Sequence, residues 1–267
     1  VGSLALGIEQ AKATIALEKK KTDSLFDGTM ECFGAGARAP GNEGCVNPDL
    51  EGLYPSLDSA ASDNFWPEEC VVTNREDVQP VACEVGNRKS QTRIALVGDS
   101  HTNHYAAAFR DLAKENNWSV EVFVKGGCPL SKASRSREDT VLTRACAKYV
   151  ENVEKIIVSN RYDLVVSSQK NGVAWITSDN ESQEETAIRG LEEVLSSLNS
   201  NGIPVLLIKD SPMPVPKVIR CLEIRAQKDC SPKRSEAFLF DPQVQAVKQS
   251  ESKLVRLVEF DDIFCND

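Results

Sequence analysis

The chain has 267 residues, of which 41% are hydrophobic and 27% are charged. This composition is typical of one large globular domain, or of a domain with an annex, and it excludes fibrous and wholly disordered proteins. Lys and Arg number 31 against 40 Asp and Glu, so the formal net charge is −9 at pH 7. Because nucleic-acid binding needs concentrated positive charge, we expect no nucleic-acid partner.

The amino-terminal third lacks a regular pattern after its first residues. Residues 4–20 carry apolar side chains three and four positions apart, which predicts a linker helix within residues 1–26. Residues 27–90 are rich in Gly, Pro, Asn, Asp and Ser and predict a loop-rich extension with neither helix nor strand. The chain starts without an initiator Met or a signal peptide, which indicates a piece of a longer polypeptide. It has no run of 18 apolar residues, so a membrane span would lie outside it.

Nine cysteines are present, with no C-x-x-C pair and no histidine at the spacing of a zinc site. Disulfides therefore suit the pattern better than a metal, and reduced buried thiols are the alternative. Such bridges persist in an oxidising compartment, which places the domain outside the cytoplasm. The ninth cysteine, Cys265, is left without a partner. Sequential proximity pairs Cys32 with Cys45, Cys70 with Cys83, Cys128 with Cys146, and Cys221 with Cys230.

From residue 91 onward, strand-like and helix-like segments alternate, the signature of a parallel sheet covered by helices. Prolines at 212, 214 and 216 exclude regular structure in the long loop that contains Cys221 and Cys230. The pattern predicts an α/β fold, a flavodoxin-like three-layer sandwich with functional sites at the carboxyl ends of its strands. Strands are expected at 93–97, 119–124, 162–167, 203–208 and 254–260, and helices at 102–116, 140–159, 184–201 and 242–252.

The strongest chemical signal is the sequence Gly98-Asp99-Ser100-His101, which places a serine between the first strand and its helix. There the hydroxyl would lie at the carboxyl edge of the sheet, where the N–H groups of a helix amino terminus favour negative charge on an attacked carbonyl. The alternative is that Ser100 only caps the helix, a common role for serine. The residues alone leave both interpretations open. The segment is not the G-x-S-x-G turn of an α/β-hydrolase.

This segment resembles the first block of the SGNH or GDSL hydrolases, in particular the SGNH domains fused to type-three membrane-bound acyltransferases. Further matches follow in order at residues 126–129, 163–167, 203–208 and 260–265. The resemblance covers residues 91–267 and implies the SGNH hydrolase fold. Residues 1–90 then resemble the linker and extension that join such a domain to its membrane portion.

The resemblance also implies roles for individual residues. Ser100 would be the nucleophile, and its own N–H would contribute to the oxyanion hole. Gly127 would be the glycine of the second block, and the adjacent Gly126 is the alternative residue. The alternative interpretation is that Gly126 and Gly127 only form a turn, without a role in catalysis. The family's G-x-N-D block is not clearly matched; Asn171 is the candidate for its asparagine in the oxyanion hole, and an ordinary loop residue is the alternative.

The family takes its general base from a D-x-x-H motif near the carboxyl end, whereas no histidine follows His104 here. We therefore expect the domain to be truncated before that block, which would also explain the unpaired Cys265. Without a base a serine hydroxyl is a poor nucleophile, so this fragment should be nearly inactive. A local pair of Ser100 and His104 is disfavoured, since triads recruit their base from another segment. Asp99 and His101 are expected to support the site, His101 by anchoring the loop beneath it.

A basic cluster, Lys132, Arg135 and Arg137, follows the second strand. It could flank a substrate channel, but a solvated charged loop is the interpretation favoured by the sequence.

The resemblance implies the extracytoplasmic domain of a membrane-bound O-acyltransferase, which transfers acetyl to cell-envelope glycans or glycolipids through an acyl-enzyme. Its partners would be the glycan acceptor and the membrane acyltransferase portion of the same polypeptide, on the periplasmic or outer face of the membrane. That portion would deliver the acyl donor, so no cofactor and no metal is expected. The alternatives are a secreted carbohydrate esterase and a non-catalytic domain that binds a glycan or partner, with Ser100 as a helix cap.

Overall fold

A computed structural model describes residues 31–38, 41–48, 57, 74–213, 216–224 and 230–265. The chain divides into two compact units. The larger one, which we call the α/β unit, comprises Phe65–Met213 and Ser235–Phe260. The smaller unit comprises Val1–Asn64, Pro214–Arg234 and Asp261–Asp267. The linker helix predicted within residues 1–26 lies outside the described residues.

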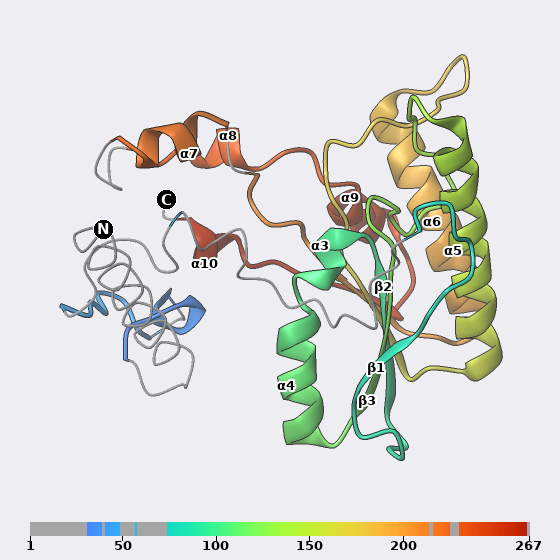
Figure 1. The fold of residues 1–267 in the computed structure, drawn as a ribbon, viewed down its shortest axis with the longest axis horizontal. Helices are drawn as coiled ribbons and strands as arrows, with labels where there is room; N and C mark the ends of the chain where they lie inside the picture. Colours follow the sequence, from blue (N-terminus) through green and yellow to red (C-terminus); the bar gives the residue numbers. More distant parts are fainter. Residues whose placement is uncertain are drawn as a thin grey trace, which may run out of the picture. The chain divides into compact units, whose positions relative to one another are not determined.

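The α/β unit contains a six-stranded sheet with the order β1-β3-β2-β4-β5-β6 (Figure 1). Strands β2 to β6 pair in parallel, and β1 pairs antiparallel with β3. The five parallel strands have the flavodoxin-like order that the sequence predicts. The strands are β1 (Cys83–Gly86), β2 (Arg93–Gly98), β3 (Ser119–Val124), β4 (Leu164–Ser167), β5 (Val205–Ile208) and β6 (Val255–Val258).

Strand β1 corrects the prediction that residues 27–90 contain no strand. It has four residues, and a four-residue segment with a central charged residue carries too little alternation to be recognised. Its pairing with β3 defines it instead, with Cys83 opposite Val122 and Gly86 opposite Ser119. Cys83 is buried in the core, so the sheet begins before the predicted domain boundary at residue 90.

Helices cover both faces of the sheet. In Figure 1, α4 lies on one side of the strands and α5 and α6 on the other. Alternate residues of β2 supply the two cores: Ala95 and Val97 pack toward α5 and α6, and Ile94 and Leu96 toward α4. The helices of this unit are α3 (Ser100–Asn103), α4 (Ala106–Asn116), α5 (Thr140–Asn160), α6 (Gln183–Ser200) and α9 (Pro242–Gln249), and α8 (Arg234–Ala237) begins at its boundary.

The helix predicted over residues 102–116 is divided into α3 and α4. At the junction the Tyr105 N–H donates to the Thr102 carbonyl at 3.1 Å, a bond to the third residue back that tightens the turn. The Thr102 hydroxyl is itself held by the Ser168 carbonyl beneath the helix. The spacing of apolar residues along the chain cannot reveal a hydroxyl contact with a distant loop. The sequence therefore predicts one continuous helix.

The prediction that the proline-rich segment lacks regular structure is also wrong. Helix α7 spans Pro216–Leu222, and proline suits the first turn of a helix because the N–H that it lacks would have no partner there. The smaller unit also contains a short 3₁₀ helix, η1 (Ala35–Arg38), and α10 (Asp261–Phe264), which lies against η1. Among the described residues, no helix combines the length and apolar composition that a membrane span needs.

Within the described residues three disulfides join cysteines that are neighbours in sequence, and the two Cα atoms of each pair lie 5.3 to 5.5 Å apart. Cys83 is also disulfide-bonded, while its predicted partner Cys70 lies outside the described residues. Cys265 is a free thiol. These are the pairings that sequential proximity predicts: Cys32–Cys45, Cys128–Cys146 and Cys221–Cys230.

Candidate functional site

The junction between β2 and α3 lies at the carboxyl edge of the sheet, near its centre. Gly98 ends the strand with φ +151°, and a Cβ at this position would overlap the Thr102 hydroxyl and lie 2.7 Å from the Ser168 carbonyl oxygen. Only glycine therefore allows the chain to pass so closely over the β4 loop. The turn that follows brings residues 99 to 101 to the sheet edge, where sites form in this kind of fold.

Asp99 is the residue that caps α3. Its Oδ1 accepts the His101 N–H at 2.9 Å, and its Oδ2 accepts the Lys170 N–H at 3.0 Å. Burial raises the pKa of this carboxyl, and the two N–H groups oppose that shift. The interpretation of Ser100 as the helix cap is therefore wrong, because the preceding aspartate performs that function and Ser100 is the first residue of the helix.

Ser100 lies in the wall of a hollow that Gly127 also lines. The N–H of Ser100 belongs to the first turn of α3, where N–H groups have no partner within the helix. Within the described residues neither this N–H nor that of Gly127 has a hydrogen-bond partner. Both N–H groups thus belong to residues that line the hollow beside the serine hydroxyl, and unpaired backbone donors near a nucleophile are the kind of group that stabilises an oxyanion.

Of the two adjacent glycines, only Gly127 has a backbone conformation and surroundings that require glycine. Gly127 has φ +68°, and its carbonyl accepts hydrogen bonds from Arg135, at 2.7 Å, and from Arg137. A Cβ on Gly126 would meet nothing within 4 Å. The geometry thus favours Gly127 as the second-block glycine, although its role in the oxyanion hole stays a prediction.

His101 is held by a residue that the sequence analysis missed. Its Nδ1 lies 2.5 Å from Oδ1 of Asp210, a buried carboxylate two residues after β5. The other carboxylate oxygen accepts the Asn171 N–H at 2.9 Å, and the Asp210 N–H donates to Asp241 at 2.9 Å. His101 therefore anchors the loops after β2, β4 and β5 to one another. A carboxylate that closely follows a buried strand was the signal available in the sequence.

Asn171 lies at the same edge, on the loop after β4. Its backbone N–H is bound to Asp210. Burial raises the pKa of Asp241, and a hydrogen bond from the Asn171 side chain opposes that shift. Its Oδ1 is buried without a hydrogen-bond partner within the described residues. The structure therefore shows Asn171 as part of the carboxylate network, and its role in an oxyanion hole stays a prediction.

His104 is the residue that ends α3. Its ring centroid lies 4.8 Å from that of His101, and partial burial together with the charge of that neighbour lowers the pKa of His104. Within the described residues no hydrogen bond joins Ser100 to His104. This arrangement fits the packing role that the sequence favours for His104.

Two hollows lie at this edge of the sheet. The first, of about 660 Å³, contains Ser100 together with Arg75, Lys125, Arg135 and Arg137, and we call it the basic pocket. The second, of about 260 Å³, lies between the β4 loop and the segment that leads into α9.

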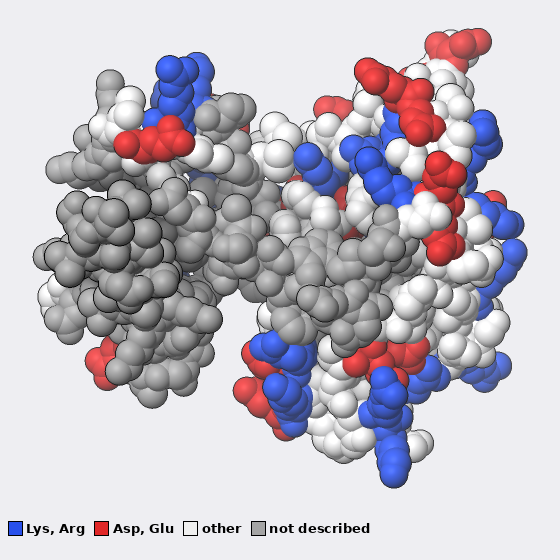
Figure 2. Space-filling model, viewed as in Figure 1, with Lys and Arg blue, Asp and Glu red and all other residues white. Residues whose placement is uncertain are grey.

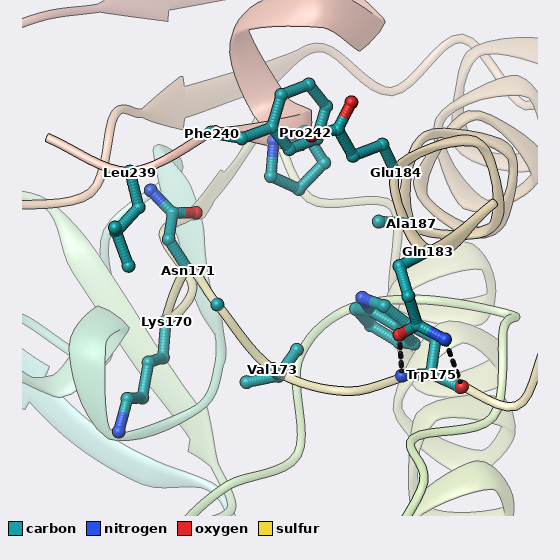
Figure 3. A pocket seen from close by; sticks show the side chains of 11 residues that line it. Lys170, Asn171, Val173, Trp175, Gln183, Glu184, Ala187, Leu239, Phe240 and Pro242 are labelled. Carbon is teal, nitrogen blue, oxygen red and sulfur yellow. Dashed lines mark hydrogen bonds between the residues drawn. The ribbon is translucent and has the colours of Figure 1, made fainter.

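Figure 3 shows Asn171 and Leu239 at one end of the second hollow and Trp175 and Gln183 at the other. The Gln183 amide holds the Trp175 backbone through two hydrogen bonds, of 2.6 and 2.9 Å. No group of three or more His, Cys, Asp and Glu side chains in the described part of the chain could hold a metal ion.

Comparison with known families matches residues 69–267 to the SGNH domain that is fused to AT3 domains. The chain belongs to this family. A similar solved structure is the periplasmic domain of the lipopolysaccharide acetyltransferase of Salmonella ser. Paratyphi A, 11% identical, with a TM-score of 0.47 over 64% of this chain and 67% of that one. No curated protein matches the chain. The matched range contains residues 91–267, over which the sequence resembles the SGNH domain, and it begins early enough to include β1.

Proposed function

We propose that this SGNH domain is the extracytoplasmic part of a membrane-bound O-acyltransferase, and that it transfers acetyl to cell-envelope glycans or glycolipids through Ser100. The observation that carries the proposal is the position of Ser100, which stands first in α3 and leaves helix capping to Asp99. A serine released from the capping role, next to unpaired N–H groups, suits nucleophilic catalysis.

The reaction would proceed in two steps. The Ser100 hydroxyl attacks the acyl carbonyl while a general base takes its proton, and the N–H groups of Ser100 and Gly127 bind the resulting oxyanion. The intermediate collapses to acyl-Ser100 as the leaving group departs with a proton. A sugar hydroxyl, deprotonated by the same base, then attacks the acyl-enzyme and regenerates the Ser100 hydroxyl.

The base is the part that residues 105–267 do not supply, because they contain no histidine. In the family this group comes from a D-x-x-H motif near the carboxyl end of the domain. We therefore expect the 267-residue chain alone to turn over activated acetyl esters very slowly. The Asp210–His101 pair keeps the Ser100 turn in place, with Nδ1 of the histidine occupied by the carboxylate.

The membrane acyltransferase portion of the same polypeptide would deliver the acyl donor. Membership of a family fused to AT3 domains supports this partner. The disulfides support an oxidising, extracytoplasmic location, since such bridges persist there.

The test compares the full-length polypeptide with the 267-residue chain, using p-nitrophenyl acetate as donor and an envelope glycan as acceptor. The full-length protein should release p-nitrophenol, acetylate the glycan and yield an acetylated Ser100 peptide by mass spectrometry. Ser100→Ala should reduce turnover by about a thousandfold or more, as the loss of a nucleophile does. The 267-residue chain should be nearly inactive.

Ser196→Ala is the matched control, because Ser196 is an exposed serine on α6 and its substitution should leave turnover unchanged. Full turnover by Ser100→Ala would refute the nucleophile, and serine-dependent turnover by the 267-residue chain would refute its inactivity. Serine-dependent hydrolysis without acetylation of any glycan would favour the secreted esterase.

A further inference from the structure

The basic pocket concentrates positive charge beside Ser100. Its cationic lining residues are Arg75, Lys125, Arg135 and Arg137, and its acidic ones are Glu138 and Asp139. Asp139 is already engaged, because its carboxylate caps α5 through the N–H groups of residues 141 and 142. The whole chain carries a net charge of −9, so a cationic hollow is a local exception.

The face of the molecule shown in Figure 2 does not show the same separation of charge. On the face shown in Figure 2, basic and acidic side chains are interspersed over α4 and over the layer of α5 and α6. Salt bridges on these helices pair Arg110 with Asp111, and Lys148 with Glu151. None of the four pocket cations forms an ion pair with a carboxylate of the described residues.

Arg135 and Arg137 are half-buried, contrary to the solvated loop that the sequence favours. Each donates one N–H to the Gly127 carbonyl, while the Nε of each is buried without a hydrogen-bond partner in the described chain. Burial lowers the pKa of both guanidinium groups, and the positive charge of Arg75 adds to this for each. Each guanidinium carries five N–H groups, and besides the bond to Gly127 the described residues accept from none of its terminal ones, so these are available to an anion in the pocket.

Lys132, the third member of the basic cluster in the sequence, behaves differently. It pairs with Glu154 on α5 and does not line the basic pocket. Lys125 is buried, donates to the Asp77 carbonyl and lies over the Tyr149 ring, so these contacts hold its ammonium group in the pocket lining. Arg135 and Arg137 are therefore the half-buried cations of the pocket that keep N–H donors available for a ligand.

We propose that the basic pocket binds an anionic substituent of the acceptor, so that this domain acylates acidic sugars, those that carry a carboxylate or a phosphate, in preference to neutral ones. The inference rests on the proposed function and specifies its substrate class. A volume of about 660 Å³ lies in the range of small-molecule sites and leaves room for a sugar ring beside Ser100. Guanidinium groups match the planar, multiple acceptors of carboxylates and phosphates.

The test is calorimetric or NMR titration of the 267-residue chain with galacturonate, glucose 6-phosphate, galactose and inorganic phosphate. At least one sugar anion should bind roughly tenfold or more tightly than galactose, as expected for charge-assisted hydrogen bonds. Comparison of galacturonate with glucose 6-phosphate identifies the preferred anion. Equal binding of galactose, or no binding of either sugar anion, would overturn the proposal.

Three variants locate the site. Arg137→Gln and Arg135→Gln should each weaken binding of the sugar anion by about tenfold. Arg75→Gln, at an exposed wall position with little structural role, should weaken it several-fold, so a folding defect in the other two does not remove the test. Arg144→Gln is the matched control, since it removes the same charge from an exposed position on α5 outside the pocket. Equal weakening by Arg144→Gln would refute the site.

Two further arms separate this proposal from its rivals. If inorganic phosphate binds as tightly as the sugar anions, the pocket does not recognise the sugar, and the proposal fails. If a nucleotide, adenosine 3′,5′-bisphosphate, displaces galacturonate and glucose 6-phosphate, the pocket binds a nucleotide and not the sugar acceptor, and the proposal also fails. Ser100→Ala should bind the sugar anion normally, because the hydroxyl is not the anion ligand. If Ser100-dependent transfer occurs equally to neutral and acidic glycans, the proposed function stands and this inference fails.

Discussion

At the scale of single residues, the two adjacent glycines after β3 allow a test of the site with a built-in control. Gly127→Ala would strain a left-handed backbone by about 1–2 kcal/mol and push the guanidinium groups of Arg135 and Arg137 away from the Gly127 carbonyl. We expect acyl transfer by the full-length polypeptide to fall by about tenfold or more. Gly126→Ala, which meets no neighbour, should keep transfer within about twofold of the wild type.

The measurement is the initial rate of transfer for both variants, with urea unfolding to check that each is folded. Equal losses in the two variants would show that the Gly-Gly turn, and not the Gly127 position, matters. A fully active Gly127→Ala would remove Gly127 from the candidate oxyanion hole.

His104 supplies a second residue-scale prediction, on stability. Burial and the neighbouring His101 lower the pKa of His104 from its ordinary value of 6.5, so the unfolded chain binds this proton more readily than the folded one. The free energy of unfolding should therefore fall as the pH drops below about 6.5. His104→Gln should flatten this part of the profile, measured by urea unfolding at several pH values. An unchanged slope in the variant would contradict the assignment.

At this scale the sequence indicates Ser100, Gly127 and the carboxylate of Asp99 as candidate site residues, but not the carboxylates of Asp210 and Asp241. Ser100 and its neighbours form a contiguous motif, whereas Asp210 and Asp241 join the site through bonds between loops after different strands. Asp99 caps the helix through Oδ1, which accepts the His101 N–H, and its Oδ2 accepts the N–H of a second partner, Lys170. That second partner is 71 residues away in the chain, beyond the reach of any local pattern.

At the scale of elements, the Cys128–Cys146 disulfide links the loop after β3 to α5. Both cysteines are buried in the core that α5 and α6 form with the sheet, and 18 positions separate them. Replacing both by Ala should lower the free energy of unfolding by about 3 kcal/mol, through the freed loop of the unfolded chain and the lost core contacts. Urea unfolding followed by far-UV circular dichroism measures this change.

The control is the double replacement of Cys32 and Cys45, which removes a disulfide of similar separation, 13 residues, from the smaller unit. Because the sheet lies wholly in the α/β unit, its unfolding free energy should change by no more than about 0.5 kcal/mol. If both double replacements lowered the unfolding free energy of the sheet equally, the effect of a disulfide would not depend on which unit contains it, and the prediction would be wrong.

The elements that the sequence predicts correctly are those with a long apolar pattern. Strand β3 has the predicted bounds, α5 is one residue longer at its carboxyl end, and α6 is shifted by one residue at each end. The errors fall where tertiary contacts define the element: β1 exists through pairing with β3, and the division between α3 and α4 accompanies the Thr102 contact with the β4 loop. Helix α7 was missed because proline excludes a helix interior but not its first turn.

At the scale of the whole molecule, the position of β1 predicts where the chain can be shortened. All six strands and both cores lie in the α/β unit, which begins at residue 65, whereas the sequence places the domain boundary after residue 90. A chain that starts at residue 65 should therefore keep the unfolding free energy of the sheet. A chain that starts at residue 91 loses β1, its four pairs with β3 and the buried Cys83, and it exposes β3 as an unprotected edge.

The shorter chain should consequently lose about 3 kcal/mol or more and aggregate at concentrations where the longer one remains monomeric, by urea unfolding and light scattering. Replacing Cys70 and Cys83 by Ala in the chain that starts at residue 65 separates the loss of a disulfide from the loss of the strand. If that variant is as unstable as the chain from residue 91, the disulfide alone matters. If the chain from residue 91 is fully stable and monomeric, β1 is dispensable and the boundary that the sequence predicts is the correct one.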